Sequence, residues 1–400
     1  MTASMTGTLL VGMDARPLSR QPTGVGRYVL NLARALARLN EPIFLRLYVP
    51  GPASAAMAPD LPQEALGMPR GALRRLDNAF TWTHARLPLH LARHRVDLLH
   101  GTFYTLPLVC PCPAVVTIHD ITFDLHPDWF TPRARLAFGG FAAASARKAR
   151  HVITVSERSR RDICERYGIP PAKVSAIPLA PDPGFVRVED PASRAAVRAR
   201  YATGDSFLLH VGAITPRRNI PRLLEAFARV RQDDRGLTLV LAGPVEPPSP
   251  PLEPLIDRLG LRGAVRLLGY VATEDLPALY SAAAAVVYPS LYEGFGLPVV
   301  EAMACGTPVL ASDGSCFPEV AGDAALLVDP TDTEAMTQGL RSIVRDEATR
   351  VRLVQAGGLR AAGLRWEETA RRTLAVYREA MEGGVSRAWK AAAKPHGADR

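Results

Sequence analysis

Cysteine is scarce in this sequence, and long apolar runs are lacking. The five cysteines are odd in number and irregularly spaced, and the pair around Pro111 has one intervening residue where redox and zinc pairs usually have two. We therefore expect no disulfide framework and buried thiols in a reducing cytoplasm. No window of about 18 apolar residues exists, which excludes a helical membrane span, and no secretory signal pattern is found. The cysteines are Cys110, Cys112, Cys164, Cys305 and Cys316.

The length of 400 residues exceeds what one hydrophobic core usually supports, so two domains of roughly 150–200 residues are expected. Apolar residues make up 48% and charged residues 22% of the chain, which is typical of a globular protein and excludes extensive disorder. The net charge of +9 comes mostly from arginine. A basic surface suits nucleic acid, anionic lipid or phosphorylated substrates, and net charge alone does not distinguish them.

Short apolar runs recur through the first half of the chain. The run at residues 8–14 precedes a glycine-bearing loop, residues 22–28 (PTGVGRY), and apolar residues at helical spacing in residues 29–39. Strand, glycine loop and helix form the opening unit of a doubly wound α/β layer. Further runs lack alternation, as expected for parallel strands buried on both faces. They are residues 43–49, 96–100, 114–119 and 151–155.

A proline-rich stretch, residues 177–188, separates this series from a second one. The second series of strands is predicted at residues 207–212, 237–243, 265–269, 285–289 and 308–312. We therefore predict two similar α/β domains in tandem, residues 1–184 and 185–365. A helix at residues 366–383 is expected to pack back toward the first domain, and residues 384–400 form a flexible tail.

Residues 293–301 (EGFGLPVVE) directly follow a predicted strand. Gly294 and Gly296 lack a Cβ and tolerate positive φ, so they let a turn approach a ligand closely. Pro298 suits the first turn of a helix, where its missing N–H is no loss. The N–H groups and dipole of such a helix would face an anion, and a diphosphate is the usual one.

Two glutamates flank this turn. Glu301 is expected in the first helical turn, near enough to accept hydrogen bonds from ribose hydroxyls. Glu293 precedes the helix, where a carboxylate would meet sugar hydroxyls or developing positive charge. The alternative is that Glu301 only complements the helix dipole and Glu293 is a solvated loop residue. The flanking glycines, the preceding strand and the proline favour the ligand site.

Residues 293–330 (EGFGLPVVEAMACGTPVLASDGSCFPEVAGDAALLVDP) resemble the donor-site signature of family 4 glycosyltransferases, a Glu, seven residues and a second Glu. The resemblance extends from MDARPLSRQPTGVGRY at Met13 to WEETARRTLAVYREA at Trp366. It implies an α/β chain of the GT-B fold, two Rossmann-like domains facing each other across a cleft, and a retaining mechanism. Residues 1–184 would then lie on the acceptor side, and residues 185–365 would bind the nucleotide-sugar donor.

The resemblance also implies residue roles. Glu301 would bind the ribose hydroxyls of the donor, and Glu293 would face the transferred sugar. The glycine loop with Gly24 and Gly26 would approach the diphosphate from the first domain. Alone, this loop would also fit a dinucleotide-binding protein, although it lacks the third glycine of that fingerprint. Backbone amides for the sugar and diphosphate would come from Gly294, Phe295, Gly296 and Leu297.

Arg217 and Arg218 lie in a predicted loop between a strand ending at Gly212 and a helix beginning near Pro221. A departing nucleoside diphosphate gains negative charge, and fixed cations beside it lower the barrier. Many family members have Arg then Lys here, and arginine contacts phosphate oxygens through two parallel hydrogen bonds. Ala213 stands where some members have a further arginine, which affects the phosphate geometry. The alternative is a solvent-facing basic loop.

Two histidines end neighbouring strands of the first domain. The resemblance implies that His119 lines the donor-sugar pocket and takes part in catalysis. The alternative for His119 is a strand-end histidine paired with Asp120. His100 lies where acceptor-side loops would gather, and an acceptor-side role and a structural role are both open for it.

Nothing in the sequence requires a metal or a cofactor other than the nucleotide-sugar co-substrate. We find no Asp-x-Asp pair and no cluster of His and Asp at ligand spacing. Arg217, Arg218 and a helix N-terminus would perform the work of a divalent cation. The nucleotide base is expected near Gly243, Tyr270 and Val271, at the ends of middle strands of the second domain.

Arginines interspersed with aromatic and leucine residues dominate residues 70–95, and a second basic run is residues 133–150. Such a mixture suits the surface of an anionic bilayer, where lipid-linked acceptors reside. A solvated helical face explains it as well. Peripheral contact with the inner face of the membrane is thus one hypothesis.

We predict a metal-independent retaining hexosyltransferase that acts in cell-surface polysaccharide or glycolipid assembly. Chains with MDARPL and PTGVGRY are most similar to mannosyltransferases that use GDP-mannose, and a UDP-hexose donor is the alternative. A sugar-nucleotide epimerase, a dinucleotide-dependent oxidoreductase and a noncatalytic sugar-nucleotide sensor are further alternatives, against which the glutamate pair and both arginines argue. The expected partners are a nucleotide sugar and a saccharide or lipid-linked acceptor, but no nucleic acid.

Overall fold

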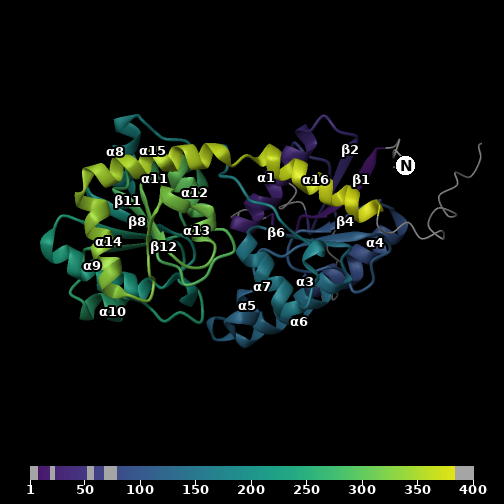
Figure 1. Cartoon of the computed structure of the whole chain (residues 1–400), viewed down its shortest axis with the longest axis horizontal. Helices are drawn as coiled ribbons and strands as arrows, with labels where there is room; N and C mark the ends of the chain where they lie inside the picture. Colours follow the sequence, from purple (N-terminus) through teal and green to yellow (C-terminus); the bar gives the residue numbers. More distant parts are fainter. Residues whose placement is uncertain (1–7, 19–22, 52–57, 67–78, 383–400) are drawn as a thin grey trace, which may run out of the picture.

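The computed structural model describes residues 8–18, 23–51, 58–66 and 79–382 of the chain. Two α/β lobes lie side by side along the long axis, each built around one sheet (Figure 1). All strand pairs within both sheets are parallel in the part of the chain so described. Parallel strands are covered by helices on both faces, which explains the near-continuous apolar runs of the sequence.

The sheet of the first lobe has seven strands in the order β3-β2-β1-β4-β5-β6-β7. The order reverses between β1 and β4, and ligands of such sheets bind at the carboxyl ends of the strands beside a reversal. The strands are β1 (Leu9–Asp14), β2 (Ile43–Val49), β3 (Gln63–Ala65), β4 (Leu98–Gly101), β5 (Ala114–Thr117), β6 (His151–Thr154) and β7 (Val174–Ala176). The helices are α1 (Gly24–Arg38), α3 (Ala79–Thr81), η2 (Trp82–Arg86), α4 (Leu87–Arg93), α5 (Thr122–Leu125), η3 (Pro127–Trp129), α6 (Pro132–Lys148), α7 (Glu157–Tyr167) and η4 (Pro171–Lys173).

The second sheet has six strands in the order β10-β9-β8-β11-β12-β13 and reverses between β8 and β11. The segments after β8 and β11 are therefore placed next to each other. The strands are β8 (Phe207–Val211), β9 (Thr238–Ala242), β10 (Val265–Gly269), β11 (Ala285–Tyr288), β12 (Val309–Ser312) and β13 (Leu326–Val328). The helices are α8 (Pro191–Tyr201), η5 (Pro216–Arg218), α9 (Ile220–Asp233), α10 (Glu253–Arg258), η6 (Thr273–Asp275), α11 (Leu276–Ala282), α12 (Leu297–Ala304), α13 (Phe317–Val320), η7 (Gly322–Ala324), α14 (Thr333–Arg345) and α15 (Glu347–Gly363).

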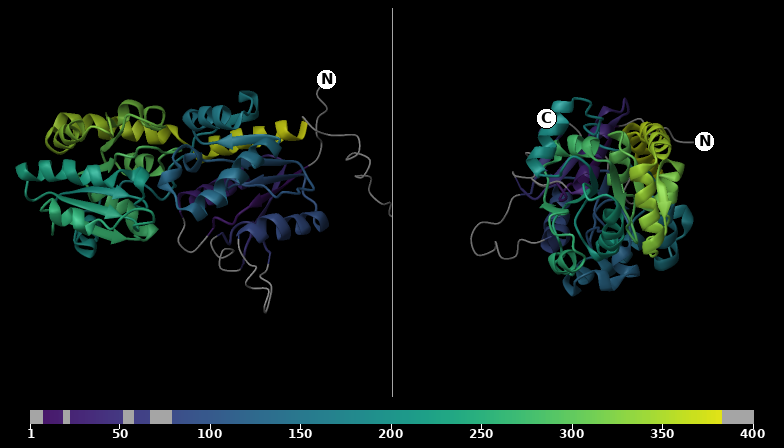
Figure 2. Two further views of the ribbon diagram at one scale, coloured as in Figure 1. Left: turned by 90° about the horizontal axis from the view of Figure 1, so that it is seen from below. Right: turned by 90° about the vertical axis from the view of Figure 1, so that its left-hand side faces the viewer.

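The last helix, α16 (Trp366–Glu382), leaves the second lobe and lies along the first, as both figures of the ribbon show (Figures 1 and 2). The Trp366 indole donates to the Pro181 carbonyl at 3.0 Å, and the Thr369 hydroxyl donates to the Pro178 carbonyl at 2.8 Å. Further along, the Tyr377 hydroxyl is 2.7 Å from Nδ1 of His100 in β4. The helix therefore fastens the chain after the second sheet to the core of the first.

Buried apolar side chains form one continuous cluster across both lobes, including Tyr28 of α1, Phe295 before α12 and Tyr377 of α16. Polar contacts also cross between the lobes. The carboxylate of Glu319 accepts from the backbone N–H groups of Glu157 at 2.8 Å and Arg158 at 3.2 Å, in the first turn of α7. An acid at a helix N-terminus is favourable because it offsets the dipole. The lobes thus contact each other through packed and charged groups.

Several sequence predictions differ from the structure. The segment with Gly24 and Gly26 was expected as a loop but is the first turn of α1, which begins at Gly24. The three-residue strands β3, β7 and β13 were not predicted. All five cysteines are free, but only Cys305 and Cys316 are buried, so the expectation of buried thiols is wrong for the other three. Within the described residues, no helix is long and apolar enough to cross a bilayer.

Candidate active site

The two arginines predicted to hold the diphosphate form the short helix η5 directly after β8. The left-handed residue Asn219 (φ 58°) ends this helix, and its side-chain amide donates to the carbonyls of Pro289 at 3.2 Å and Pro330 at 2.7 Å. These bonds hold the loop against the end of β11. Arg218 is buried, whereas the side chain of Arg217 is 25% exposed.

Glu293 lies at the centre of the charged cluster. Nη1 of Arg218 pairs with Oε1 of Glu293 and donates to the Tyr288 hydroxyl at 2.5 Å. Nη1 of Arg217 is 3.7 Å from the other oxygen, Oε2. Glu293 is 5% exposed, and its backbone N–H donates to the Ser315 hydroxyl at 2.8 Å. Glu293 is therefore no solvated loop residue, since its charge is balanced by two guanidinium groups.

Burial affects the charged state of this cluster. It lowers the pKa of the Arg218 guanidinium, because desolvation disfavours a cation, while Tyr288 acts in the opposite direction. The Arg218 guanidinium carbon lies 4.9 Å from the centre of the Tyr288 ring, a cation–π contact that partly replaces the lost solvation. A buried arginine stays protonated, so it is a fixed positive charge beside Glu293.

The glycines between Glu293 and α12 are required by close packing. A Cβ on Gly294 would lie 2.5 Å from the backbone oxygen of His119, which belongs to the other lobe. Gly296 has φ 85° and is the N-cap of α12, and a Cβ there would lie 2.6 Å from the Phe317 ring. Only glycine fits these two positions. The turn therefore lies directly against the end of β5 in the first lobe.

The N-termini of α1 and α12 meet where the two lobes join. A Cβ on Gly24, the first residue of α1, would lie 3.9 Å from Cδ1 of Leu297, the first residue of α12. The Thr23 hydroxyl caps α1 by accepting from the Gly26 N–H at 3.4 Å. Each helix N-terminus presents unpaired N–H groups and a partial positive charge. Together with the two arginines, they make this region suited to a diphosphate.

Glu301 is the fifth residue of α12, so the prediction that it lies in the first turn is wrong. The residue is 1% exposed and contacts the other lobe. Its Oε1 is 3.0 Å from Nη2 of Arg27 in α1, and its Oε2 accepts from the Tyr280 hydroxyl at 3.3 Å. Burial raises the pKa of Glu301, and Arg27 opposes that rise. The simple dipole role does not fit a carboxylate one turn into the helix with a cationic partner.

His119 is 8% exposed and follows β5. Its Nε2 is 3.1 Å from the Thr102 carbonyl, which only accepts, so Nε2 carries the proton and Nδ1 is an acceptor. Burial lowers the pKa of His119, which favours this neutral form. Asp120, the partner in the alternative interpretation of His119, accepts from Thr122 at 3.0 and 2.8 Å and contacts Arg217 at 3.4 Å, and its charge acts on His119 only by opposing the lowering of the pKa.

His100 takes the structural role that the sequence left open. It is fully buried in β4, with Nδ1 2.7 Å from the Tyr377 hydroxyl and Nε2 2.7 Å from the Thr117 hydroxyl. Burial lowers its pKa to about 3, so the ring is neutral. Both ring nitrogens are engaged within the first lobe and α16, which fits the structural alternative for His100.

The residues predicted near the base lie beyond the ends of β9 and β10. Gly243 (φ 156°) forms a backbone bridge with Gly269, and a Cβ on Gly243 would overlap the Gly212 carbonyl. Tyr270 is 46% exposed, whereas Val271 is buried. The Tyr270 side chain is thus available to a ligand, while Val271 contributes mainly to packing.

Sequence reasoning missed the partners of the predicted residues. Arg27 and Tyr280 contact Glu301, Ser315 contacts Glu293, and Tyr288 contacts Arg218. The position of Arg27 directly after the glycine-bearing segment was a usable signal. Its pairing with a residue of the other lobe was not visible in the sequence, because it depends on how the lobes meet.

The comparisons with known proteins agree over both lobes. Residues 22–184 match the family described as Glycosyltransferase Family 4, and residues 195–360 match Glycosyl transferases group 1. O-antigen chain mannosyltransferase B of Escherichia coli is 32% identical over 378 residues, which are 90% of this chain and 97% of that protein. MMP alpha-(1->4)-mannosyltransferase of Mycolicibacterium hassiacum is 34% identical over 283 residues, 67% of this chain and 66% of that protein.

Solved structures of similar shape cover nearly the whole chain. Sucrose-phosphate synthase from Thermosynechococcus elongatus superposes with a TM-score of 0.73 at 22% identity, covering 94% of this chain and all of that chain (100%). Anabaena Alr3699/HepE in complex with UDP and glucose gives a TM-score of 0.73 at 20% identity, with 93% and 99% covered. At these identities the likeness concerns the fold. Together with the family matches along both lobes, it leads to the conclusion that this chain is a glycosyltransferase of family 4 with the GT-B fold.

Proposed function

We propose that the chain is a retaining mannosyltransferase that moves mannose from GDP-mannose to a saccharide or lipid-linked acceptor in the assembly of a cell-surface polysaccharide or glycolipid. Two relatives support mannose as the sugar, O-antigen chain mannosyltransferase B of Escherichia coli and O-antigen chain mannosyltransferase RfbU of Salmonella typhimurium. The predicted alternative, a UDP-hexose donor, is the competing outcome of the tests below.

The main support for the proposal is that Arg217 and Arg218 both contact Glu293, beside two helix N-termini. The arginines and helix ends supply positive charge for a departing diphosphate. Glu293 contacts both guanidinium groups. When a bound diphosphate accepts hydrogen bonds from the two arginines, the Glu293 carboxylate would become available to the donor sugar. The cluster is built for stabilising charge separation between a sugar and a diphosphate.

Retention is proposed to proceed by attack on the face that the diphosphate leaves. A double displacement needs a carboxylate that is free to bond to the sugar. Glu293 is committed to Arg217 and Arg218, and Asp120 to Thr122 and Arg217. These engagements favour a front-face route in which the leaving phosphate assists deprotonation of the acceptor.

The transfer is proposed to need no divalent cation, because arginines and helix N-termini supply the charge. Turnover with an excess of EDTA should equal turnover with Mg²⁺. A large loss of turnover in EDTA that Mg²⁺ restores would overturn the proposal of metal-independent transfer.

Nucleotide choice tests the donor directly. A ligand that binds only the folded state raises Tm in proportion to its affinity and concentration. GDP should raise Tm more than UDP at equal concentration. A larger shift with UDP would favour the UDP-hexose alternative.

We propose further that the first lobe contacts an anionic membrane. Phe80, Leu108 and Val109 are 52%, 57% and 73% exposed. They are neighbours, since the Phe80 ring is 4.5 Å from the His84 ring and the Leu108 N–H donates to His84 Nδ1 at 3.2 Å. Such an apolar patch with basic neighbours fits a bilayer surface.

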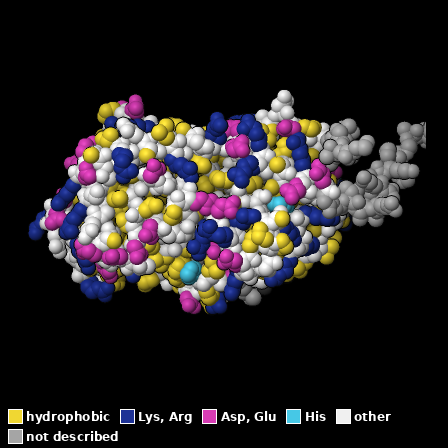
Figure 3. All heavy atoms as spheres, in the orientation of Figure 1, with side chains coloured by type: hydrophobic (Ala, Val, Ile, Leu, Met, Phe, Trp, Pro, Cys, Tyr) yellow, Lys and Arg dark blue, Asp and Glu magenta, His cyan; other side chains and the backbone are white. Residues whose placement is uncertain are grey.

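The basic neighbour of this patch is Lys148, whose ammonium group donates to the Pro107 and Leu108 carbonyls at 2.7 and 2.5 Å. The arginines at positions 70, 74 and 75 that contributed to the prediction lie outside the described residues. On the face drawn in Figure 3, basic and acidic side chains are interspersed over both lobes, so the net charge is not gathered there. The proposal of membrane contact therefore rests on the apolar patch more than on the overall charge.

Co-sedimentation with vesicles of phosphatidylglycerol and phosphatidylethanolamine tests the patch. Val109→Asp should release the protein to the supernatant. The matched control Val351→Asp changes a 45% exposed valine on α15 of the other lobe and should leave binding unchanged. Equal release by both variants, or no binding of the unmodified chain, would contradict membrane contact through this patch.

A further inference from the structure

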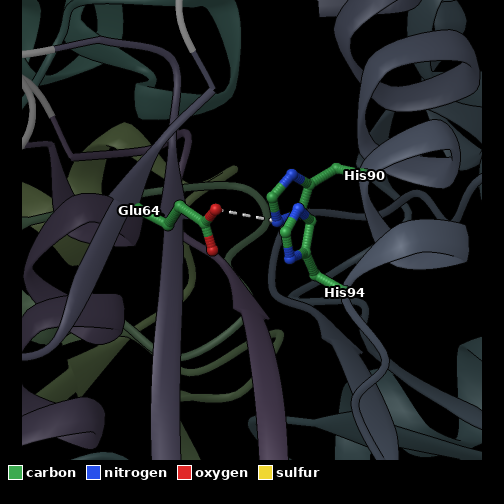
Figure 4. A group of neighbouring side chains, drawn as sticks. All are labelled: Glu64, His90 and His94. Carbon is green, nitrogen blue, oxygen red and sulfur yellow. Dashed lines mark ion pairs between the residues drawn. The ribbon is translucent and has the colours of Figure 1, made fainter.

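Three potential metal ligands gather at the outer edge of the first lobe, away from the arginine cluster of the second lobe. Glu64 lies on the edge strand β3, and His90 and His94 lie on and just after helix α4, facing the strand (Figure 4). One ligand atom from each side chain lies within 4.8 Å of the other two. The closest approach is 3.0 Å, between His90 Nε2 and Glu64 Oε1.

We propose that Glu64, His90 and His94 bind one divalent transition-metal ion, with Zn²⁺ as the natural occupant. Two imidazole nitrogens and one carboxylate oxygen are a common three-residue zinc set, with a water in the fourth position. Imidazole also suits Co²⁺, Ni²⁺ and Cu²⁺, whereas Mg²⁺ and Ca²⁺ prefer oxygen ligands alone. The sequence prediction concerned clusters of His and Asp and did not single out this set, in which His90 and His94 are four residues apart and the carboxylate is a glutamate.

The local structure explains why the two rings point the same way. Residues four apart on a helix share a face. The backbone N–H of His94 donates to the His90 carbonyl at 2.8 Å, so the helical turn persists to His94. The rings are stacked, with centroids 4.4 Å apart and planes 20° apart.

The polar atoms of this group already face one another. His90 Nε2 is buried and lies 3.0 Å from Glu64 Oε1. Ligand atoms around a tetrahedral zinc lie about 3.3 Å apart, given bonds of about 2.0 Å. The remaining distance would be closed by movement of the exposed His94 side chain.

Neighbouring groups define the surroundings of the ion. Arg46 Nε is 3.9 Å from Glu64 Oε2, so it holds the oxygen that does not face the histidines. Such outer contacts orient a ligand, although the charge of Arg46 also weakens the attraction for a cation. The Tyr48 ring contacts the His90 ring edge-on, at a centroid distance of 5.3 Å.

A bound ion would join β3 to α4, two elements that are otherwise held mainly by side-chain contacts. Its effect is therefore expected on the stability of the first lobe. It does not depend on the proposed mannosyl transfer, because none of the donor-site residues takes part.

Metal binding is measured on the full chain, purified without a histidine tag and stripped with EDTA. Titration with Zn²⁺ should show one bound ion per chain and a rise in Tm. Co²⁺ should give the visible absorption of a tetrahedral or five-coordinate site. His94→Ala removes an exposed ligand without loss of buried packing and should weaken Zn²⁺ binding at least about tenfold.

Glu64→Gln should weaken binding to a similar extent. His126→Ala is the matched control, since His126 lies in the same lobe, stacked on Trp129, and belongs to a different neighbourhood. It should bind Zn²⁺ as the unmodified chain does. Absence of a stoichiometric ion in the unmodified chain, or unchanged affinity in both His94→Ala and Glu64→Gln, would overturn the proposal.

Discussion

Arg27 of the first lobe and Glu301 of the second form a buried ion pair, with Nη2 3.0 Å from Oε1 and side chains 12% and 1% exposed. Burial alone would lower the pKa of Arg27, but Glu301 and the nearby Tyr280 raise it above its ordinary value. The guanidinium carbon also lies 5.4 Å from the centre of the Phe185 ring. The glutamate expected to meet the ribose is thus paired with a cation of the opposite lobe.

Replacing this arginine should destabilise the protein in a pH-dependent way. Arg27→Met leaves the Glu301 carboxylate buried without its cation, a loss of about 3 kcal/mol in the free energy of unfolding. Without Arg27 the pKa of Glu301 rises further above its ordinary 4.5, so the folded state binds a proton that the unfolded state does not. The stability difference from the unmodified chain should therefore be largest near neutral pH and shrink as the pH falls toward 4.5.

The matched control for this prediction is Arg34→Met. Arg34 lies on the same helix as Arg27, and the substitution removes its exposed ion pair with Asp60. An exposed pair contributes about 0–1 kcal/mol. Urea unfolding of both variants between pH 4.5 and 7.5 measures the effect. An Arg27→Met deficit that is constant across this range would show that the charge of Glu301 is not what Arg27 compensates.

Glu293→Gln should remove most activity while keeping the shape of the side chain. The substitution removes the negative charge that pairs with Arg217 and Arg218 and that, under the proposed function, would face the developing positive charge of the sugar. Loss of one such electrostatic group lowers kcat by about 10²–10³-fold. Initial rates of nucleoside diphosphate release measure it, and Glu334→Gln, in an exposed pair with Arg229, is the control.

The two arginines should respond differently to lysine. Arg217→Lys should lower kcat/KM with little loss of stability, because its side chain is 25% exposed. Arg218→Lys should lower kcat/KM and also the free energy of unfolding by about 1–3 kcal/mol, because the more strongly hydrated lysine ammonium is costlier to bury beside Glu293 and loses the stacking of the guanidinium on the Tyr288 ring. Kinetics and thermal unfolding of both variants separate the two effects. Equal stability of the two variants would contradict the stabilising role of the buried Arg218.

How far the sequence predicts the fold depends on strand length. The strands β2 (Ile43–Val49) and β8 (Phe207–Val211) were predicted within a residue, because each is a buried apolar run. The strand β7 (Val174–Ala176) was missed, since three residues at a sheet edge carry too little pattern. The helical Gly24 was expected in a loop because glycine and proline resemble turn signals there, whereas the Thr23 cap determines the start of α1.

The site was predictable where its chemistry is local. Glu293 and Gly296 stand in one short motif whose strand, turn and helix follow from their order in the chain. Arg27 and Asp120 are partners that come from the other lobe. Such partners follow from the packing of the lobes, which a single sequence does not encode in any local pattern.

Gly294→Ala should separate the lobes at the site. The added Cβ would lie 2.5 Å from the His119 carbonyl oxygen, a backbone atom that cannot move without displacing β5. We expect a fall in activity of at least tenfold, since a misplacement of about 1 Å costs up to 10²-fold, and a larger radius of gyration in solution scattering. Gly314→Ala, with nothing within 4 Å of its added Cβ, should behave as the unmodified chain. Equal activity of both variants would mean that the close approach of turn and β5 is not needed for turnover.

The central claim is tested most directly by the rate of nucleoside diphosphate release from GDP-mannose, GDP-fucose, UDP-glucose and UDP-galactose. Slow hydrolysis without an acceptor is enough for the comparison, and Glu293→Gln gives the background. The account predicts that GDP-mannose turns over fastest and that the rate falls to background in Glu293→Gln. Preference for a UDP-sugar, or no turnover of any donor above the background, would contradict it.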